Sequence, residues 1–138
     1  MEKIYYWDSS AVLSLLINDK HSAEATKYYN KTHINIISSL VIAEVLAVLA
    51  RIEREKKELK ILLDACRHSF QEGRWRVITL SPTFDDLQLY SQKYPLRGAD
   101  LWHLTLVLNI KQELPTITII TFDQKLENAA KDLEILHK

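Results

Sequence analysis

The sequence predicts an α/β fold with a mostly parallel central sheet of four to five strands and helices on both faces. Short apolar runs alternate with amphipathic helical segments along the 138 residues, the order expected of a parallel sheet with crossover helices. The first run, residues 4–7, is continuously apolar and aromatic, as in a strand buried on both faces. Hydrophobic residues make up 47% of the chain, which is enough for a substantial core. At this length we expect one domain, residues 1–138.

The first half of the chain reads as two strands, each followed by helices. Asp8 or Ser9 would cap the first helix, and Ser38 or Ser39 would cap the long helix after the second strand. The expected elements are strand 4–7, helix 9–17, helix 21–31, strand 34–37 and helix 40–56.

The second half continues the alternation. Gly73 would end a helix over residues 57–71, and Ser81 with Pro82 would open a helix that reaches Lys93. Pro115 would end the strongly apolar helix that is expected over residues 99–113. The remaining expected elements are strand 75–80, loop 94–98, helix 99–113, strand 116–121, a helix from Asp123 to Lys131, and an edge strand over 133–136.

The composition excludes several kinds of site. Only Gly73 and Gly98 are glycines, so a Walker A loop and a G-x-G-x-x-G turn are both absent. Lys plus Arg and Asp plus Glu number 18 each, whereas a general nucleic-acid binder would be more basic. Either the protein has no nucleic-acid partner, or acids gather in one pocket and bases surround it. Composition alone leaves both alternatives open.

Cysteine content and the N-terminal segment indicate the compartment. Cys66 is the single cysteine, so an intramolecular disulfide and a Cys-rich zinc site are excluded. Lys3 and Asp8 interrupt the apolar start of the chain, which argues against a signal peptide or a membrane span. We therefore expect a cytoplasmic protein without a membrane association.

Three aspartates stand at or near expected helix starts: Asp8, Asp100 and Asp123. Taken singly, each is best explained as a helix cap. However, Asp8 and Asp123 both follow strands, and Asp100 begins the helix that leads to the last clear strand. If these strands are neighbours, the three carboxylates converge at one end of the sheet. Clustered carboxylates repel unless a cation neutralises them, and oxygen ligands select Mg²⁺ or Mn²⁺.

Glu44 is the only charged residue between Ser39 and Arg51. The surrounding run is apolar on every side, which predicts a buried helix. A buried carboxylate is normally paired, hydrogen-bonded or bound to a metal. The alternatives to a site role are a salt bridge to a buried arginine or a position on an exposed edge.

Four segments of the sequence resemble the PIN domain family, and within it the VapC-like toxin ribonucleases of toxin–antitoxin pairs. Residues 6–12 read Tyr-Trp-Asp-Ser-Ser-Ala-Val, and residues 38–46 read Ser-Ser-Leu-Val-Ile-Ala-Glu-Val-Leu. Residues 97–104 read Arg-Gly-Ala-Asp-Leu-Trp-His-Leu, and residues 121–126 read Thr-Phe-Asp-Gln-Lys-Leu. Leu101 and Trp102 depart from the smaller residues that are usual after that aspartate.

The resemblance implies a three-layer α/β/α PIN-like fold and a metal-dependent ribonuclease that hydrolyses RNA phosphodiester bonds. It implies that Mg²⁺ or Mn²⁺ is held by four catalytic acids, which are Asp8, Glu44, Asp100 and Asp123. It assigns supporting hydroxyls to Ser9 and Thr121, whereas we expect His103 to be bonded within the core. The basic residues near these segments, which would contact phosphates, are Arg97, Lys125, Lys93 and Lys20. The partners it implies are RNA, a cognate antitoxin protein and a second copy of the chain in a homodimer.

Rival interpretations are a catalytically silent adaptor with the same fold, and another α/β protein with an acidic pocket. A haloacid-type phosphatase requires Asp-x-Asp after the first strand, where Ser10 stands. A receiver domain requires a lysine at the end of a late strand, where Thr121 stands. Both are poor matches, so the adaptor is the main alternative.

Overall fold

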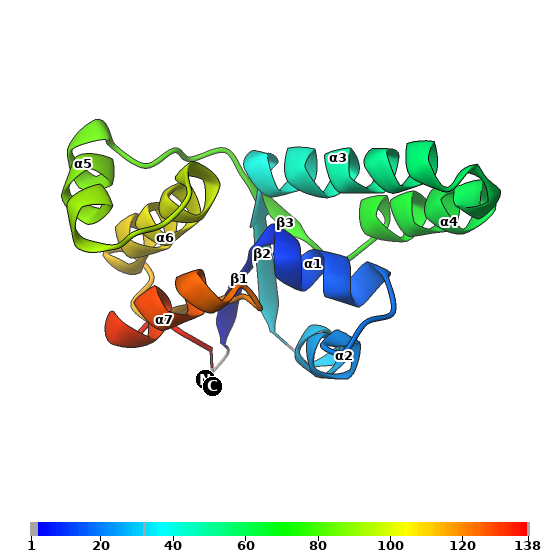
Figure 1. Ribbon diagram of the computed structural model, residues 1–138. Helices are drawn as coiled ribbons and strands as arrows, with labels where there is room; N and C mark the ends of the chain where they lie inside the picture. The colour runs from blue at the N-terminus through cyan, green and yellow to red at the C-terminus, as the bar shows by residue number, and fades with distance from the viewer. Residues whose placement is uncertain (1–2, 32, 138) are drawn as a thin grey trace.

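The protein contains a parallel sheet that runs through its centre (Figure 1). The computed structural model describes residues 3–31 and 33–137. Within them the sheet has four strands in the order β3-β2-β1-β4, and each pairing is parallel. The strands are β1 (Ile4–Trp7), β2 (Ile34–Ser38), β3 (Arg76–Ile78) and β4 (Ile117–Ile120). Since Trp7 pairs with Ile120, β1 and β4 end side by side.

Helices cover both faces of the sheet, and Figure 1 shows α1 to α4 on one side and α5 to α7 on the other. The predicted three-layer α/β/α architecture is therefore confirmed. The first layer contains α1 (Ser9–Leu16), α2 (Ser22–Asn30), α3 (Ser39–Glu55), a short 3-10 turn (Lys57–Leu59) and α4 (Lys60–Gln71). The second contains α5 (Phe84–Lys93), α6 (Gly98–Lys111) and α7 (Gln124–Asp132).

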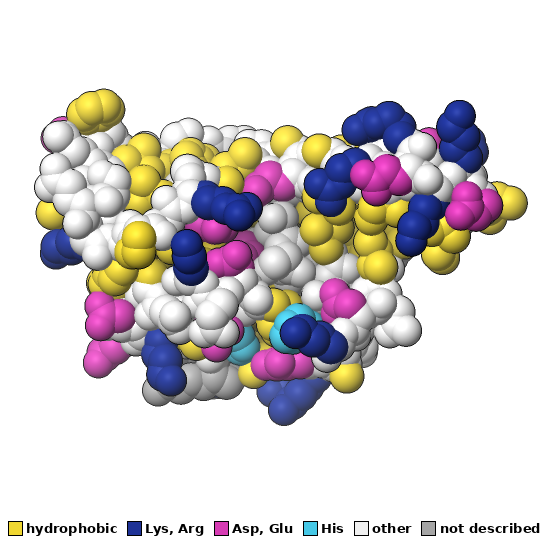
Figure 2. Space-filling view, viewed as in Figure 1, with side chains coloured by type: hydrophobic (Ala, Val, Ile, Leu, Met, Phe, Trp, Pro, Cys, Tyr) yellow, Lys and Arg dark blue, Asp and Glu magenta, His cyan; other side chains and the backbone are white. Residues whose placement is uncertain are grey.

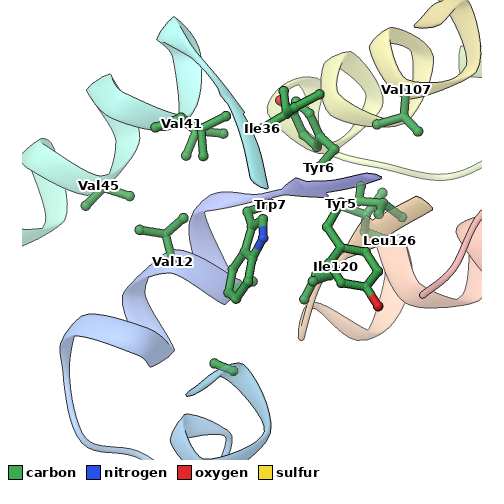
Figure 3. Packing of buried hydrophobic residues seen from close by; sticks show 14 of the residues in the cluster. Tyr5, Tyr6, Trp7, Val12, Ile36, Val41, Val45, Val107, Ile120 and Leu126 are labelled. Carbon is green, nitrogen blue, oxygen red and sulfur yellow. The ribbon is translucent and has the colours of Figure 1, made fainter. Parts of the chain in front are cut away.

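The centre of the core is β1, as its continuous apolar run predicts. Tyr5, Tyr6 and Trp7 are each at most 1% exposed. Their side chains alternate between the two faces of the sheet (Figure 3). Trp7 packs edge-on against Tyr29 of α2, whereas Tyr6 lies against His103 of α6. This packing fixes the end of β1, and with it the position of Asp8.

Most expected boundaries shift by one to three residues, and two larger differences have a clear physical reason. The helix expected to open at Ser81 and Pro82 begins instead at Phe84, because the hydroxyl of Thr83 accepts the backbone N–H of Asp86 and caps it. The edge strand expected over 133–136 is reduced to one parallel bridge between Leu136 and Ile119. The chain turns at Glu134, whose φ of 58° is in the left-handed region, so only a short stretch reaches the outer edge of β4.

The expectation that α3 is buried on every side is wrong. Only Val41, Val45 and Leu49 are buried, and Leu46 is 40% exposed. The reason is packing: α3 projects beyond the sheet, where α1 and α4 cover just one of its faces (Figure 1). Within the described residues, no helix has both the length and the apolar character to cross a bilayer.

Candidate active site

The site lies where β1 and β4 end together. Asp8 directly follows β1, Thr121 directly follows β4, and the N–H of Asp8 donates to the carbonyl of Ile120 at 3.2 Å. Asp123 comes two residues later. The carboxyl end of a parallel sheet is the common position for ligand sites in α/β proteins.

Asp8 is 2% exposed and is held by three donors. Its Oδ1 accepts from the Ser10 hydroxyl at 2.7 Å and from the backbone N–H of Ala11 at 2.9 Å. Its Oδ2 accepts a short hydrogen bond from the Thr121 hydroxyl. Burial raises the pKa of Asp8, and the three hydrogen bonds act in the opposite direction. Since each oxygen has about two lone pairs, Oδ2 can still accept one further ligand.

The hydroxyls of Ser10 and Thr121 connect the start of α1 to the turn between β4 and α7. Ser10 Oγ also accepts the N–H of Phe122 at 3.0 Å, and Thr121 Oγ1 accepts the N–H of Asp123 at 3.1 Å. Thr121, one of the two supporting hydroxyls that the resemblance implies, thus bonds directly to the Asp8 carboxylate. On the α1 side the bonded hydroxyl belongs to Ser10, which the sequence argument passed over in favour of the adjacent Ser9.

The other two aspartates differ in their bonding. Asp123 caps α7, since its Oδ1 accepts the N–H of Leu126 at 3.0 Å. Asp100 lies in the first turn of α6, where the cap residue Arg97 makes no side-chain bond. No protein donor within residues 3–31 and 33–137 bonds to the Asp100 carboxylate. The helix-cap explanation therefore holds for Asp8 and Asp123 and fails for Asp100.

The charges around Asp100 show which acids are neighbours. Burial together with the charges of Asp123, Asp8 and Glu44 raises the pKa of Asp100 to about 6, and His103 opposes this rise. Like charges produce such a shift only at short range. The other three acids singled out in the sequence therefore all lie near Asp100, although they are spread from residue 8 to residue 123.

Glu44 is paired with a buried histidine. Its Oε1 lies 2.6 Å from Nε2 of His103, which is 1% exposed. A carboxylate can only accept, so the histidine N–H donates. On the other side of the ring, Nδ1 lies 2.7 Å from the Tyr6 hydroxyl, which in turn lies 2.9 Å from the hydroxyl of Ser38. As expected, His103 is bonded within the core.

This chain of hydrogen bonds begins and ends on the same helix. Ser38 caps α3 through the N–H of Val41, and Glu44 lies on the second turn of α3. Tyr6 of β1 and His103 of α6 connect the two. These hydrogen bonds connect β1, α3 and α6 and hold the Glu44 carboxylate in place. Trp102 packs edge-on against the His103 ring, which adds a further support.

The candidate phosphate contacts Arg97, Lys125, Lys93 and Lys20 are all exposed. Arg97 immediately precedes α6, and Lys125 is the second residue of α7, so they flank Asp100 and Asp123. Figure 2 shows acidic side chains gathered near the middle of one face, with Lys and Arg side chains beside them. Lys and Arg side chains therefore stand beside the acids, as in the second of the two alternatives that composition left open.

The donor set suits a hard divalent cation, although the side chains are not arranged around one. Among the described residues, no three His, Cys, Asp or Glu side chains are placed to hold a metal ion as they stand. Asp8, Asp123 and Glu44 each direct an oxygen to a protein donor. The ligands are nevertheless all oxygens, which Mg²⁺ and Mn²⁺ prefer.

The sheet, its two helical layers and the acids at one end define a PIN domain. Residues 5–132 match the model of the PIN domain family, and the chain belongs to that family. PIN domains are generally nucleases, which are hydrolases. No curated protein matches the chain.

Two solved structures are similar to this one. PAE2754 from Pyrobaculum aerophilum is 19% identical with a TM-score of 0.60, and the match covers 93% of this chain and 85% of that one. VapC20 from Mycobacterium tuberculosis, a toxin that cleaves the sarcin–ricin loop, is 14% identical with a TM-score of 0.59, over 91% and 94% of the two chains. At these identities the similarity establishes the shared fold.

Proposed function

We propose that the protein is a divalent-cation-dependent endoribonuclease that acts as the toxin of a toxin–antitoxin pair. The observation that carries this proposal is Asp100. It is partly buried and lacks a protein donor within the described residues. Burial together with neighbouring carboxylates raises its pKa to about 6. A fold that holds like charges together in this way is prepared for a cation. The fold that the chain shares with VapC20, an RNA-cleaving toxin, supports RNA as the substrate.

Asp8, Asp100, Glu44 and Asp123 would hold the cation, Mg²⁺ or Mn²⁺. When bound, such an ion lowers the pKa of water and neutralises phosphate charge. Asp8 would supply Oδ2, because its Oδ1 is fully used by Ser10 and Ala11. Near pH 7, the Asp100 carboxylate is mostly ionised and so could bind a cation, because its pKa of about 6 lies about one unit below that pH.

The remaining side chains would orient the acids and the RNA. Thr121 fixes Asp8, and His103 fixes Glu44. Arg97 and Lys125, at the starts of α6 and α7, are suited to contact the RNA phosphates beside the cleaved bond. Lys93 and Lys20 would contact phosphates further along the RNA. Such contacts bind the backbone without reading sequence.

The proposal includes two protein partners and a compartment. We expect a homodimer and an antitoxin that covers the acidic site, acting in the cytoplasm where RNA substrates are present. Elution of the pure protein as a monomer at micromolar concentration would contradict the dimer.

The direct test is cleavage of structured and single-stranded RNA by the purified protein with Mg²⁺, with Mn²⁺ and with EDTA. We expect cleavage with either cation and none with EDTA or in Asp8→Asn. RNA that stays intact with every cation would instead favour the catalytically silent adaptor.

A further inference from the structure

We propose that a cavity between residues 94–96 and helix α7 is a nucleobase subsite for single-stranded RNA. This inference rests on the proposed function and adds a substrate contact to it. The cavity has a volume of about 220 Å³. Its lining consists of Tyr94, Pro95, Leu96, Lys125, Asn128 and Ala129.

The cavity is formed by two segments that are next to acids in the chain. Residues 94–96 lead directly into Arg97 and the first turn of α6, which carries Asp100. The α7 side begins two residues after Asp123, and Asp123 is close enough to raise the pKa of Asp100. Asn128 lies five residues beyond Asp123, or about 7.5 Å along the helix. An RNA strand with a phosphate at the acids could therefore place an adjacent base here.

The aromatic wall of the cavity is held in place. The Tyr94 hydroxyl donates to Oδ2 of Asp132 at 2.5 Å, which raises the pKa of Tyr94 to about 12. Lys125, Asn128 and Asp132 recur at helical spacing and share one face of α7. Because Tyr94 follows α5 and is bonded near the end of α7, its ring is fixed along the side of this helix. The subsite is thus formed before any RNA binds.

The lining matches the chemistry of a base. Tyr94, Pro95, Leu96 and the buried Ala129 provide apolar surface, and an aromatic ring next to a cation is the usual platform for unpaired bases. Asn128 Oδ1 accepts from Gln124 at 2.8 Å, which leaves its amide N–H groups to donate to a base edge. Lys125 can contact the phosphate of the same nucleotide. A purely apolar ligand would make no hydrogen bond with the Asn128 amide and no contact with the charge of Lys125.

The test is the affinity of the whole protein for a short single-stranded RNA, measured by fluorescence anisotropy in EDTA at low salt. One nucleotide at a time is replaced by an abasic residue. In the wild type we expect one position where the missing base weakens binding about tenfold. Tyr94→Leu should abolish this dependence on position. Tyr94→Phe, which loses the bond to Asp132 and keeps the ring, should preserve it.

A second pair of variants covers the case in which Tyr94→Leu does not fold. Lys125→Ala should weaken binding several-fold more than Lys131→Ala, an equal charge change at an exposed site of α7 outside the cavity. Asn128→Ala should reduce the abasic effect at the sensitive position.

Binding and cleavage separate the two proposals. A position effect without cleavage under any cation would support the subsite and contradict the nuclease. Cleavage without a position effect would overturn the subsite alone. Equal effects of Lys125→Ala and Lys131→Ala would contradict the phosphate contact of Lys125 in both proposals. An absence of RNA binding would overturn both.

Discussion

Asp8 and Asp100 contribute to the same acidic site, yet they are held in opposite ways. Asp8 is almost fully buried and receives hydrogen bonds from two hydroxyls and a backbone N–H. Asp100 is partly exposed and receives no bond from a protein donor in the described residues. Burial raises the pKa of both groups. Only Asp8 has donors that compensate for this effect.

In the cation site proposed above, the two carboxylates would be positioned in different ways. One carboxylate is fixed by the fold, and the other is kept near it against electrostatic repulsion. We therefore expect Asp8 to matter for both stability and activity. Asp100 should matter for activity at a cost to the stability of the metal-free protein.

Asp8→Asn should have the largest effect. The amide NH₂ would replace one carboxylate oxygen and face either the Thr121 donor or the Ser10 and Ala11 donors. We therefore expect a loss of about 1–3 kcal/mol in the free energy of unfolding. Activity should fall by more than the roughly 100-fold that is typical of losing a residue that only supports a metal ligand. RNA cleavage and urea denaturation of the same preparation measure the two effects. An active or more stable variant would contradict the role given to Asp8.

Asp100→Asn should also abolish most cleavage and yet stabilise the metal-free protein at pH 7. The folded-state pKa of about 6 is above the ordinary value of 3.8, so the folded state binds the proton more tightly. Stability from this group is present below about pH 4 and is lost as pH rises through 6. After allowance for solvent screening, we expect a gain of about 1 kcal/mol in the variant.

Denaturation in EDTA between pH 4 and pH 7 checks this prediction. The decline in stability with rising pH should be shallower in Asp100→Asn than in the wild type. Identical slopes would mean that Asp100 is not subject to the repulsion described above.

Thr121→Val removes the hydrogen bond that supports Asp8 and leaves the charge of the Asp8 carboxylate in place. The substitution keeps the shape and removes the donor to Asp8, so it should cost about 1–2 kcal/mol of stability and roughly tenfold in activity. Thr121→Ser is the matched control because it retains the hydroxyl. Equal activity of the two variants would show that the hydrogen bond is unimportant.

Tyr6→Phe should have the smallest effect on activity among these changes and should act through His103 and Glu44. We expect a loss of about 1 kcal/mol and a severalfold reduction in kcat, with KM for RNA unchanged. Tyr5→Phe is the control, because the buried Tyr5 hydroxyl has no hydrogen-bond partner within the described residues. A similar drop in kcat for both variants would refute the proposed role of the chain from Ser38 to Glu44.

Features that depend on adjacent residues could be predicted from the sequence. The strand of β1 and the caps at Asp8 and Asp123 follow from an apolar run that ends at a carboxylate. The choice between Ser9 and Ser10 depends on where the turn of α1 directs each side chain, which the residue types do not reveal. The exposure of Leu46 could not be predicted either, because it depends on which helices pack against α3.

The contacts of Glu44 illustrate the same limit over longer range. Its apolar surroundings indicated that it needs a partner. That the partner is His103, 59 residues away and supported by Tyr6, depends on how α6 crosses α3. Sequence spacing carries no information about that crossing.

The central claim is that four separated carboxylates form one divalent-cation site. Titration of Mn²⁺ into the metal-free protein at pH 7, followed by electron paramagnetic resonance, tests it most directly. We predict saturable binding in the wild type that is weakened at least tenfold in Asp8→Asn and in Asp100→Asn alike. Equal Mn²⁺ affinity in the wild type and both variants would contradict the account.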